Sequence, residues 1–161
     1  MSKMISIIMG SESDLDTVSE SVKILQEFKV GFEIIVLSAH RTPKEVAVYT
    51  EKARSRGIKV FICAAGGAAA LAGVVAAHTT LPVIGIPIET KSLKGLDSLL
   101  STVQMPAGIP VASMAIGKAG AKNAALFALE ILSISDNAVC KKLSVYKKNM
   151  RVKVLSSKLK I

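Results

Sequence analysis

The stretch from Ile58 to Ala77, IKVFICAAGGAAALAGVVAA, contains a single charged residue and is rich in alanine. Its length and hydrophobicity suit a membrane-spanning helix, but a pair of glycines interrupts it near the middle. Short apolar runs that end at small or turn-forming residues are typical of buried strands. We therefore interpret this stretch as a strand over 58–63, a small-residue loop over 64–69 and a helix that ends near His78.

The same order of strand, loop and helix recurs along the chain. Four further apolar runs are expected to form strands, namely Met4–Met9, Phe32–Leu37, Pro82–Ile86 and Ile109–Ala115. Helices are expected over 13–28, 43–56, 94–105 and 117–132. Because the strands are apolar throughout rather than alternating, both faces of the sheet must be covered. We predict an α/β fold, a three-layer α/β/α sandwich with a flavodoxin-like parallel sheet.

Two of the expected helices begin with capping signals. Ser13 is followed three residues later by Asp16, as in an N-cap with an acidic partner. Thr42 precedes Pro43, which suits the first helical position, and Glu45 completes a capping box.

The length of 161 residues suits one domain. We expect a single domain over 1–161, with an α/β core over 1–135 and a basic C-terminal helix over 136–161 that Asp136 caps. The net charge is +9, and residues 138–161 contribute eight basic and no acidic residues, which leaves +1 for the rest. We interpret this tail as the solvated face of a terminal helix. A nucleic-acid surface is the alternative, and it predicts binding that falls steeply with salt.

The two cysteines, Cys63 and Cys140, make neither a disulfide framework nor a zinc pattern. No cluster of His, Cys, Asp and Glu has the spacing of metal ligands, so we expect no metal site. The sequence enters an apolar strand by Met4 without a visible signal peptide. We expect free thiols, no membrane association and a cytoplasmic location.

Ligands of open α/β sheets bind beyond the carboxyl ends of the strands, and three loops leave those ends first. The first loop is Gly10–Asp14. The hydroxyls of Ser11 and Ser13 and the free N–H groups of the helix suit a phosphate or a sugar hydroxyl, while Asp14 can accept bonds from a ribose or a ring amine. Plain helix capping is the alternative explanation for this loop.

The second loop, Ser38–Pro43, places His40 beside Arg41. A histidine can give or take a proton at neutral pH, and an arginine offers a planar fork to a carboxylate or phosphate. An exposed surface histidine is the alternative. The third loop, Ala64–Ala69, has almost no side chains, so its backbone can approach a flat ligand closely; tight helix–sheet packing explains it equally well.

Five segments occur in an order that resembles one family. They are GSESD (Gly10–Asp14), SAHRTP (Ser38–Pro43), GGAA (Gly66–Ala69), GLDSLLSTVQMPAGIPVAS (Gly95–Ser113) and KNAALFALEIL (Lys122–Leu132). The chain is similar in these segments to the aminoimidazole ribonucleotide carboxylase/mutase family, the PurE family. The resemblance covers about Met4 to Leu132, and the tail matches only in being helical.

The resemblance implies an activity and a set of site residues. It implies a mutase that converts N5-carboxyaminoimidazole ribonucleotide into 4-carboxyaminoimidazole ribonucleotide in purine biosynthesis, with His40 as general acid and base. The implied substrate-binding residues are Gly10, Ser11, Ser13, Asp14, Ser38, Ala39, Arg41, Gly66, Gly67 and Ala68, with Gln104–Pro106 lining the pocket. It further implies a homo-octamer with shared active sites and no metal or organic cofactor.

One position departs from the family pattern. The family usually reads GGAAHLPG in the third loop, and this chain has Ala70 in place of the histidine and Ala72 in place of the proline. Two alternatives to the mutase therefore stay open. One is a carboxylase that uses free CO2, and the other is an inactive nucleotide-binding homologue.

Overall fold

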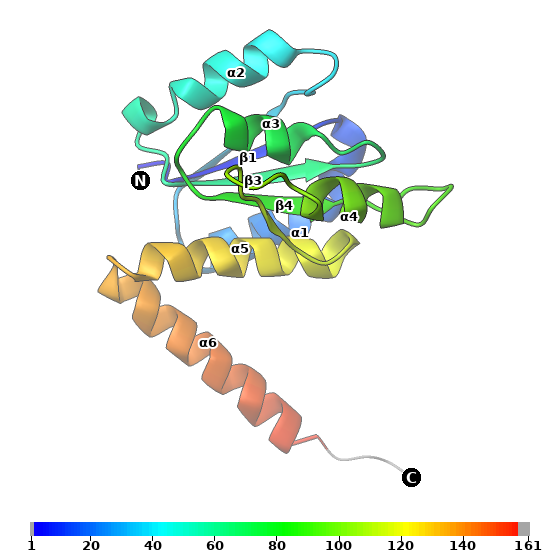
Figure 1. Ribbon diagram of the computed structural model, residues 1–161. Coiled ribbons are helices and arrows are strands. Elements are labelled where there is room, and N and C mark those ends of the chain that lie inside the picture. Colours follow the sequence, from blue (N-terminus) through cyan, green and yellow to red (C-terminus); the bar gives the residue numbers. More distant parts are fainter. Residues whose placement is uncertain (1, 158–161) are drawn as a thin grey trace. The chain divides into compact units, whose positions relative to one another are not determined.

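A five-stranded parallel sheet forms the centre of the computed structural model, which describes residues 2–157 (Figure 1). The strands are β1 (Ile5–Met9), β2 (Phe32–Val36), β3 (Val60–Ala65), β4 (Val83–Pro87) and β5 (Ala112–Ser113). The helices are α1 (Leu15–Glu27), α2 (Pro43–Glu51), α3 (Leu71–Ala77), α4 (Leu96–Val103), α5 (Gly117–Ser133) and α6 (Asn137–Leu155). The strand order is β2-β1-β3-β4-β5, the order of flavodoxin-like sheets. The predicted fold class is confirmed.

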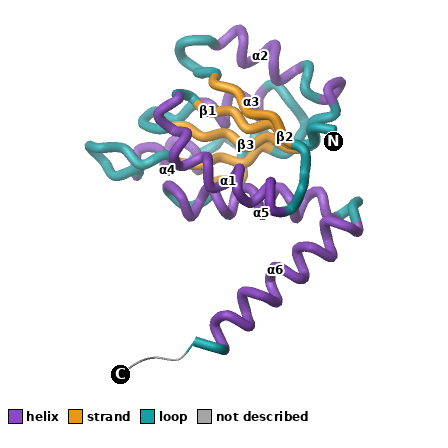
Figure 2. Tube along the Cα trace, turned by 180° about the vertical axis from the view of Figure 1, so that it is seen from behind, coloured by secondary structure: helices purple, strands orange, loops and turns teal. Residues whose placement is uncertain are grey.

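Helices cover both faces of this sheet (Figures 1 and 2). On one face, α2 and α3 pack on a cluster that includes Ile8, Phe61 and Cys63. On the other face lie α1 and the part of α5 before residue 129, where the Ser21 hydroxyl donates to the Ala121 carbonyl at 2.6 Å. All five residues of β1 are buried, as expected for an apolar strand covered on both sides.

Small residues let helices approach the sheet closely. A Cβ atom on Gly85, in β4, would lie 2.3 Å from Cγ2 of Thr102, in α4. Real Cβ atoms essentially never make contacts that short, so any other residue at this position would force Thr102 to shift, and glycine lets α4 pack directly on β4. This packing places α4 against the loops that follow β3 and β4, where Ser98 bonds to Gly67 and Ile88.

The strand predictions need two corrections. Strand β3 begins two residues later than expected and continues through Ala65, because the alanines 64 and 65 still pair with Met9, Ile86 and Pro87. The run expected to form a strand over 109–115 pairs only at Ala112–Ser113. Pro110 has no N–H to donate to a ladder, which accounts for the late start of β5.

The described residues form two compact units that divide after Ala128. In the second unit, the Asp136 carboxylate accepts from the N–H groups of Ala138 and Val139 at 2.9 and 3.2 Å, which confirms the predicted cap of α6. Lys147 pairs with Glu130 at 2.7 Å. The basic residues of α6 are exposed, while Lys158 and Lys160 lie outside the described residues. Within 2–157 no helix has both the length and the hydrophobicity needed to cross a bilayer.

A polar network joins the edge strand β2 to its neighbours. Tyr49 donates a hydrogen bond to Glu33 at 2.5 Å and lies 2.7 Å from the Ser6 hydroxyl, while Arg56 pairs with Glu33 at 3.2 Å and stacks over the Tyr49 ring. Burial acts to raise the pKa of Glu33, but the bonds from Tyr49 and Arg56 outweigh it and lower that pKa. Burial and the Glu33 carboxylate raise the pKa of Tyr49 to about 12.

We predict that Glu33→Gln lowers the free energy of unfolding by about 1–2 kcal/mol at neutral pH, because it weakens charge-assisted hydrogen bonds. A carboxyl group whose pKa is lowered in the folded protein stabilises that protein at pH values above the ordinary pKa of a glutamate, near 4.3. This stabilisation is lost as the pH falls through the lowered pKa. The difference between wild type and variant should therefore shrink below about pH 4, measured by urea denaturation across this range. Glu27→Gln, an exposed position on α1, is the control. If Glu33→Gln lowered the free energy of unfolding by the same amount at every pH, the assigned role of the carboxylate would be wrong.

Candidate active site

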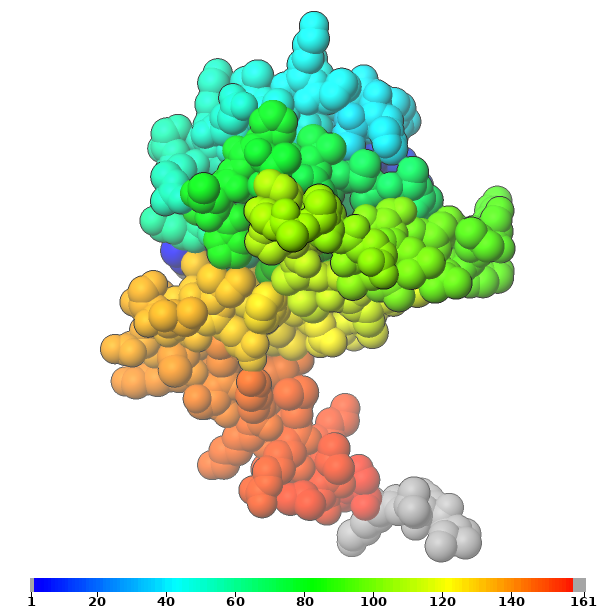
Figure 3. All heavy atoms as spheres, in the orientation of Figure 1, coloured from blue at the N-terminus to red at the C-terminus, as the bar shows by residue number. Residues whose placement is uncertain are grey.

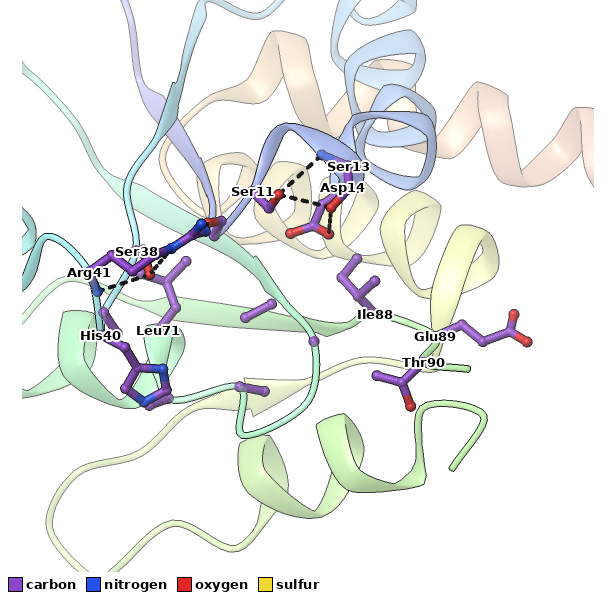
Figure 4. Close-up of a pocket in the computed structure, with 16 residues that line it drawn as sticks. Ser11, Ser13, Asp14, Ser38, His40, Arg41, Leu71, Ile88, Glu89 and Thr90 are labelled. Atoms are coloured by element: carbon purple, nitrogen blue, oxygen red, sulfur yellow. Dashed lines mark hydrogen bonds between the residues drawn. The ribbon is translucent and has the colours of Figure 1, made fainter. Parts of the chain in front are cut away.

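A cavity of about 460 Å³ lies at the carboxyl edge of the sheet. The loops that follow β1, β2, β3 and β4 surround it (Figure 4). Its lining residues are Gly10, Ser11, Ser13, Asp14, Ser38, Ala39, His40, Arg41, Ala65, Gly66, Ala69, Ala70, Leu71, Ile88, Glu89 and Thr90. The chain leaves β1 toward β2 and then crosses back to β3, so the cavity lies at the topological switch point, where such sheets bind ligands.

The first loop differs from the predicted helix cap. Ser11, rather than Ser13, is the N-cap: its Oγ accepts from the Ser13 N–H at 3.3 Å and caps a short 3-10 turn, Glu12–Asp14. Helix α1 follows at Leu15 with no side-chain cap from Asp14. The sequence pattern identified a cap but not which serine fills it, because the extra 3-10 turn shifts the start of the helix. The Asp14 carboxylate is consequently left to face the cavity (Figure 4).

Asp14 is a buried carboxyl group with only 8% of its surface exposed. Burial raises its pKa, and the opposing effects of Ser13, Ser11 and Arg41 do not cancel that rise. The Ser13 hydroxyl lies 3.3 Å from Oδ1 of Asp14 and 2.9 Å from Oγ of Ser11. The first loop therefore presents two hydroxyls and a poorly solvated carboxyl group together.

The second loop is closed by Thr42, which does not form the predicted capping box. Its hydroxyl accepts from the Ser38 N–H at 2.9 Å and donates to the Ser38 carbonyl at 3.0 Å, and no side-chain cap bond is formed. Pro43 does occupy the first turn of α2, as expected. The Thr42 hydroxyl thus bonds within its own loop and not, as the sequence pattern predicted, to the first turn of α2.

Arg41 joins the second loop to the first. Its Nη2 donates to the Gly10 carbonyl at 2.7 Å, and its Nε lies 3.3 Å from the Ser38 hydroxyl. A guanidinium group has five N–H bonds, so these two contacts leave others to bind an anionic ligand. These two bonds fix the orientation of the guanidinium group and leave its positive charge available to a ligand.

His40 lies across the cavity from Ser11 and Asp14 (Figure 4). Its side chain is exposed, and among residues 2–157 it has no hydrogen-bonding partner. An accessible imidazole facing a cavity can exchange protons with a bound ligand. The geometry thus separates the imidazole from the hydroxyl and carboxyl groups on the opposite wall.

The third loop lies between these groups and carries two left-handed residues, Gly67 with φ of 68° and Ala69 with φ of 30°. Gly66 lines the cavity, whereas Gly67 and Ala68, both proposed from the sequence as ligand contacts, do not. Nor do Gln104, Met105 and Pro106 line it; Met105 lies where a side chain on Gly73 of α3 would meet it at 3.2 Å.

Several lining residues were missed by the sequence reasoning, above all Ile88, Glu89 and Thr90. Glu89 and Thr90 carry the same signal as the other loops, because they are polar residues that closely follow an apolar run, 82–86. The Ile88 N–H donates to the Ala65 carbonyl at 3.0 Å, which draws this segment to the cavity. Glu89 points outward, away from His40 (Figure 4), and the Thr90 hydroxyl donates to the Asp97 carboxylate of α4.

Ala70 also lines the cavity. The position at which the family pattern has a histidine is therefore part of the site, and it presents only a methyl group. No group of three or more His, Cys, Asp or Glu side chains in the described part of the chain is arranged to hold a metal ion.

Fold and cavity together define an α/β protein with a candidate ligand site that presents hydroxyls, a carboxyl group and a guanidinium at the switch point of its sheet. The sequence matches the family model described as AIR carboxylase over residues 4–153, and the chain belongs to this family.

Named relatives extend over nearly the whole chain. The N5-carboxyaminoimidazole ribonucleotide mutase of Bacillus subtilis (strain 168) is 54% identical over 157 residues, 98% of this chain and 97% of the relative. The protein of the same name from Pyrococcus horikoshii is 56% identical over 151 residues, 94% of this chain and 84% of the relative. The crystal structure of Treponema denticola PurE has a TM-score of 0.86 at 28% identity, covering 95% of this chain and 94% of that one.

We predict that Asp14→Asn stabilises the protein at neutral pH, because a carboxyl group whose pKa is raised by burial costs stability once it ionises. The advantage of the variant should be larger at about pH 7 than at about pH 4, near the ordinary pKa of an aspartate, because burial penalises only the ionised form. Thermal unfolding at both pH values measures it. Asp16→Asn, an exposed neighbour, is the control. An advantage that does not grow with pH would show that ionised Asp14 carries no such penalty.

Proposed function

We propose that this protein is an N5-carboxyaminoimidazole ribonucleotide mutase of purine biosynthesis. The proposal rests on one observation above the others: a histidine and an anchored arginine face the same cavity as the Ser11–Asp14 loop. Relatives with this name share more than half of their aligned residues with the chain. We further propose that residues 1–161 act as one domain and that the enzyme works in the cytoplasm.

The cavity has complementary groups for each part of a ribonucleotide. The N–H groups at the start of α1, with the hydroxyls of Ser11 and Ser13, suit the phosphate. Asp14 suits the ribose hydroxyls as a hydrogen-bond acceptor, and Arg41 adds positive charge for phosphate or carboxylate. This arrangement leaves the base to extend toward His40 and the glycine-containing third loop.

The reaction needs one proton to be given and one to be taken. Protonation of the carbamate nitrogen breaks the N–C bond and releases CO2, leaving an aminoimidazole whose C4 is an enamine carbon. C4 then attacks CO2, a C–C bond forms, and C4 must lose its proton to restore the aromatic ring. His40 supplies the first proton and removes the second, so it ends each turnover in the state in which it began.

Closure of the site favours recapture of CO2. Holding CO2 beside C4 replaces an encounter in solution by a reaction within one complex, which is an entropic advantage. Gly66 and the small side chains of Ala65, Ala69 and Ala70 leave room for the backbone to lie against the ring. Neither a free-CO2 carboxylase nor an inactive homologue is favoured by a particular contact of the cavity, so both remain outcomes of the assays below.

We propose, in addition, a homo-octamer whose active sites are shared between subunits. The outer face of α4 and the loop before it carry exposed apolar residues, Leu93, Leu96, Leu100 and Val103. This segment, green in Figure 3, stands out at the surface of the first unit. Exposed apolar patches of this kind favour association between subunits.

Turnover by the wild-type protein and by His40→Asn tests the proposed function. Wild type should convert N5-carboxyaminoimidazole ribonucleotide to the 4-carboxy isomer. His40→Asn should bind the nucleotide with similar affinity but lose about 10²–10⁴-fold in rate, the usual contribution of a placed acid–base group. His78→Asn is the control, because His78 lies at the end of α3 and pairs with Glu51. Full activity in His40→Asn would remove His40 from the mechanism.

The variant Ala70→His measures what the departure from the family pattern does. Because His40 alone can carry both proton transfers, we expect the variant to change the rate of wild type by less than about tenfold. The measurement is kcat for both proteins under identical conditions. An inert wild type together with an active Ala70→His would instead identify the chain as a disabled member of the family.

A further inference from the structure

Ser98 is a fully buried hydroxyl in the first turn of α4. Its Oγ accepts from the Gly67 N–H at 3.0 Å and donates to the Ile88 carbonyl at 2.7 Å. Gly67 belongs to the loop after β3, and Ile88 to the segment after β4. One side chain outside the cavity therefore joins two of the segments that form its wall.

The neighbouring residues of α4 strengthen this junction. The Asp97 carboxylate accepts from the Thr90 hydroxyl, with its two oxygens at 2.8 and 3.0 Å, and Thr90 lines the cavity. The Ser101 hydroxyl, one turn after Ser98, donates to the Asp97 carbonyl at 2.9 Å and also lies 3.4 Å from the Gly67 carbonyl. The first turns of α4 thus hold the third loop and the end of β4 at the same time.

The third loop needs such an anchor because of its backbone. Gly67 and Ala69 are both left-handed, and this conformation is unfavourable for alanine. A Cβ atom on Gly66 would lie 3.5 Å from the Cβ of Ile88, an ordinary van der Waals contact, so the third loop and the segment after β4 lie side by side here. The distance between the third loop and Ile88 therefore determines how closely the cavity wall can surround a ligand, and the Ser98 hydroxyl is bonded to both sides of that gap.

We propose that Ser98 is a positioning residue that holds the third loop against the end of β4 and so retains CO2 during the reaction. This inference rests on the proposed mutase function. Once the carbamate N–C bond has broken and the nitrogen has gained its proton, CO2 has two fates. It is attacked by C4 to give the isomer, or it leaves for solvent and aminoimidazole ribonucleotide remains. If the third loop is held less firmly against the end of β4, more CO2 escapes and a larger share of the substrate ends as aminoimidazole ribonucleotide.

The experiment compares Ser98→Ala with wild type, using N5-carboxyaminoimidazole ribonucleotide as substrate. Both products are quantified, and spontaneous decarboxylation without enzyme is subtracted. The variant should lose about tenfold in kcat, release several times more aminoimidazole ribonucleotide per isomer formed, and change KM by less than about threefold, since the phosphate and ribose contacts are untouched.

Thr102→Val is the matched control. Thr102 is a buried hydroxyl of the same helix, but it donates to the Ser98 carbonyl at 2.7 Å and not to a cavity loop. Its loss should lower stability without changing the product ratio. If Ser98→Ala does not fold, Ser98→Cys replaces it, because a thiol is only slightly larger than a hydroxyl and forms weaker hydrogen bonds, and the same change in product ratio is expected.

The outcomes separate the two proposals. A wild-type protein that forms no isomer would refute the proposed function itself. An active wild type whose product ratio is unchanged in a folded Ser98 variant would overturn the role of Ser98 and leave the mutase intact. An equal rise in released aminoimidazole ribonucleotide in Thr102→Val would also overturn it, because general loss of stability would then explain the effect.

Discussion

Parallel pairing of β1 with both β2 and β3 is the constraint on which the site depends. Met9 pairs with Val36 on one side and with Ala64 on the other, so three strands end at the same level and their loops leave side by side. Parallel strands place all their carboxyl ends at one edge. The hydroxyls, the guanidinium and the imidazole that meet there come from segments far apart in sequence, and the bond from Arg41 to the Gly10 carbonyl joins two of them.

Much of this arrangement can be predicted from the sequence, because strongly apolar runs such as 58–63 allow few structures other than a covered strand. The loops after the first three strands therefore identified most of the cavity. Competition for the same hydroxyl groups cannot be predicted from local patterns. Ser11 rather than Ser13 caps the first turn, and Thr42 closes its loop. Polar residues after the fourth apolar run do mark the segment Ile88–Thr90, but the bond that brings it to the cavity, from the Ile88 N–H to the Ala65 carbonyl, joins two distant parts of the chain and cannot be predicted locally.

Function and stability oppose each other in the first loop and support each other around α4. Burial raises the pKa of Asp14, so the group that suits a ribose is costly to the folded protein when ionised. Around α4, in contrast, Ser98 satisfies buried backbone groups of two segments, and the same bonds that stabilise them also set the width of the cavity. Gly85 makes this possible by letting α4 rest on β4.

In the proposed reaction, CO2 moves from nitrogen to C4 without leaving the cavity. The most direct measurement uses substrate that carries an isotopic carbon label in its carbamate group, turned over in buffer with excess unlabelled bicarbonate. We expect the isomer to retain the label, as measured by its mass. An isomer that carries unlabelled carbon from the buffer would contradict a mutase and indicate a carboxylase that draws CO2 from solution.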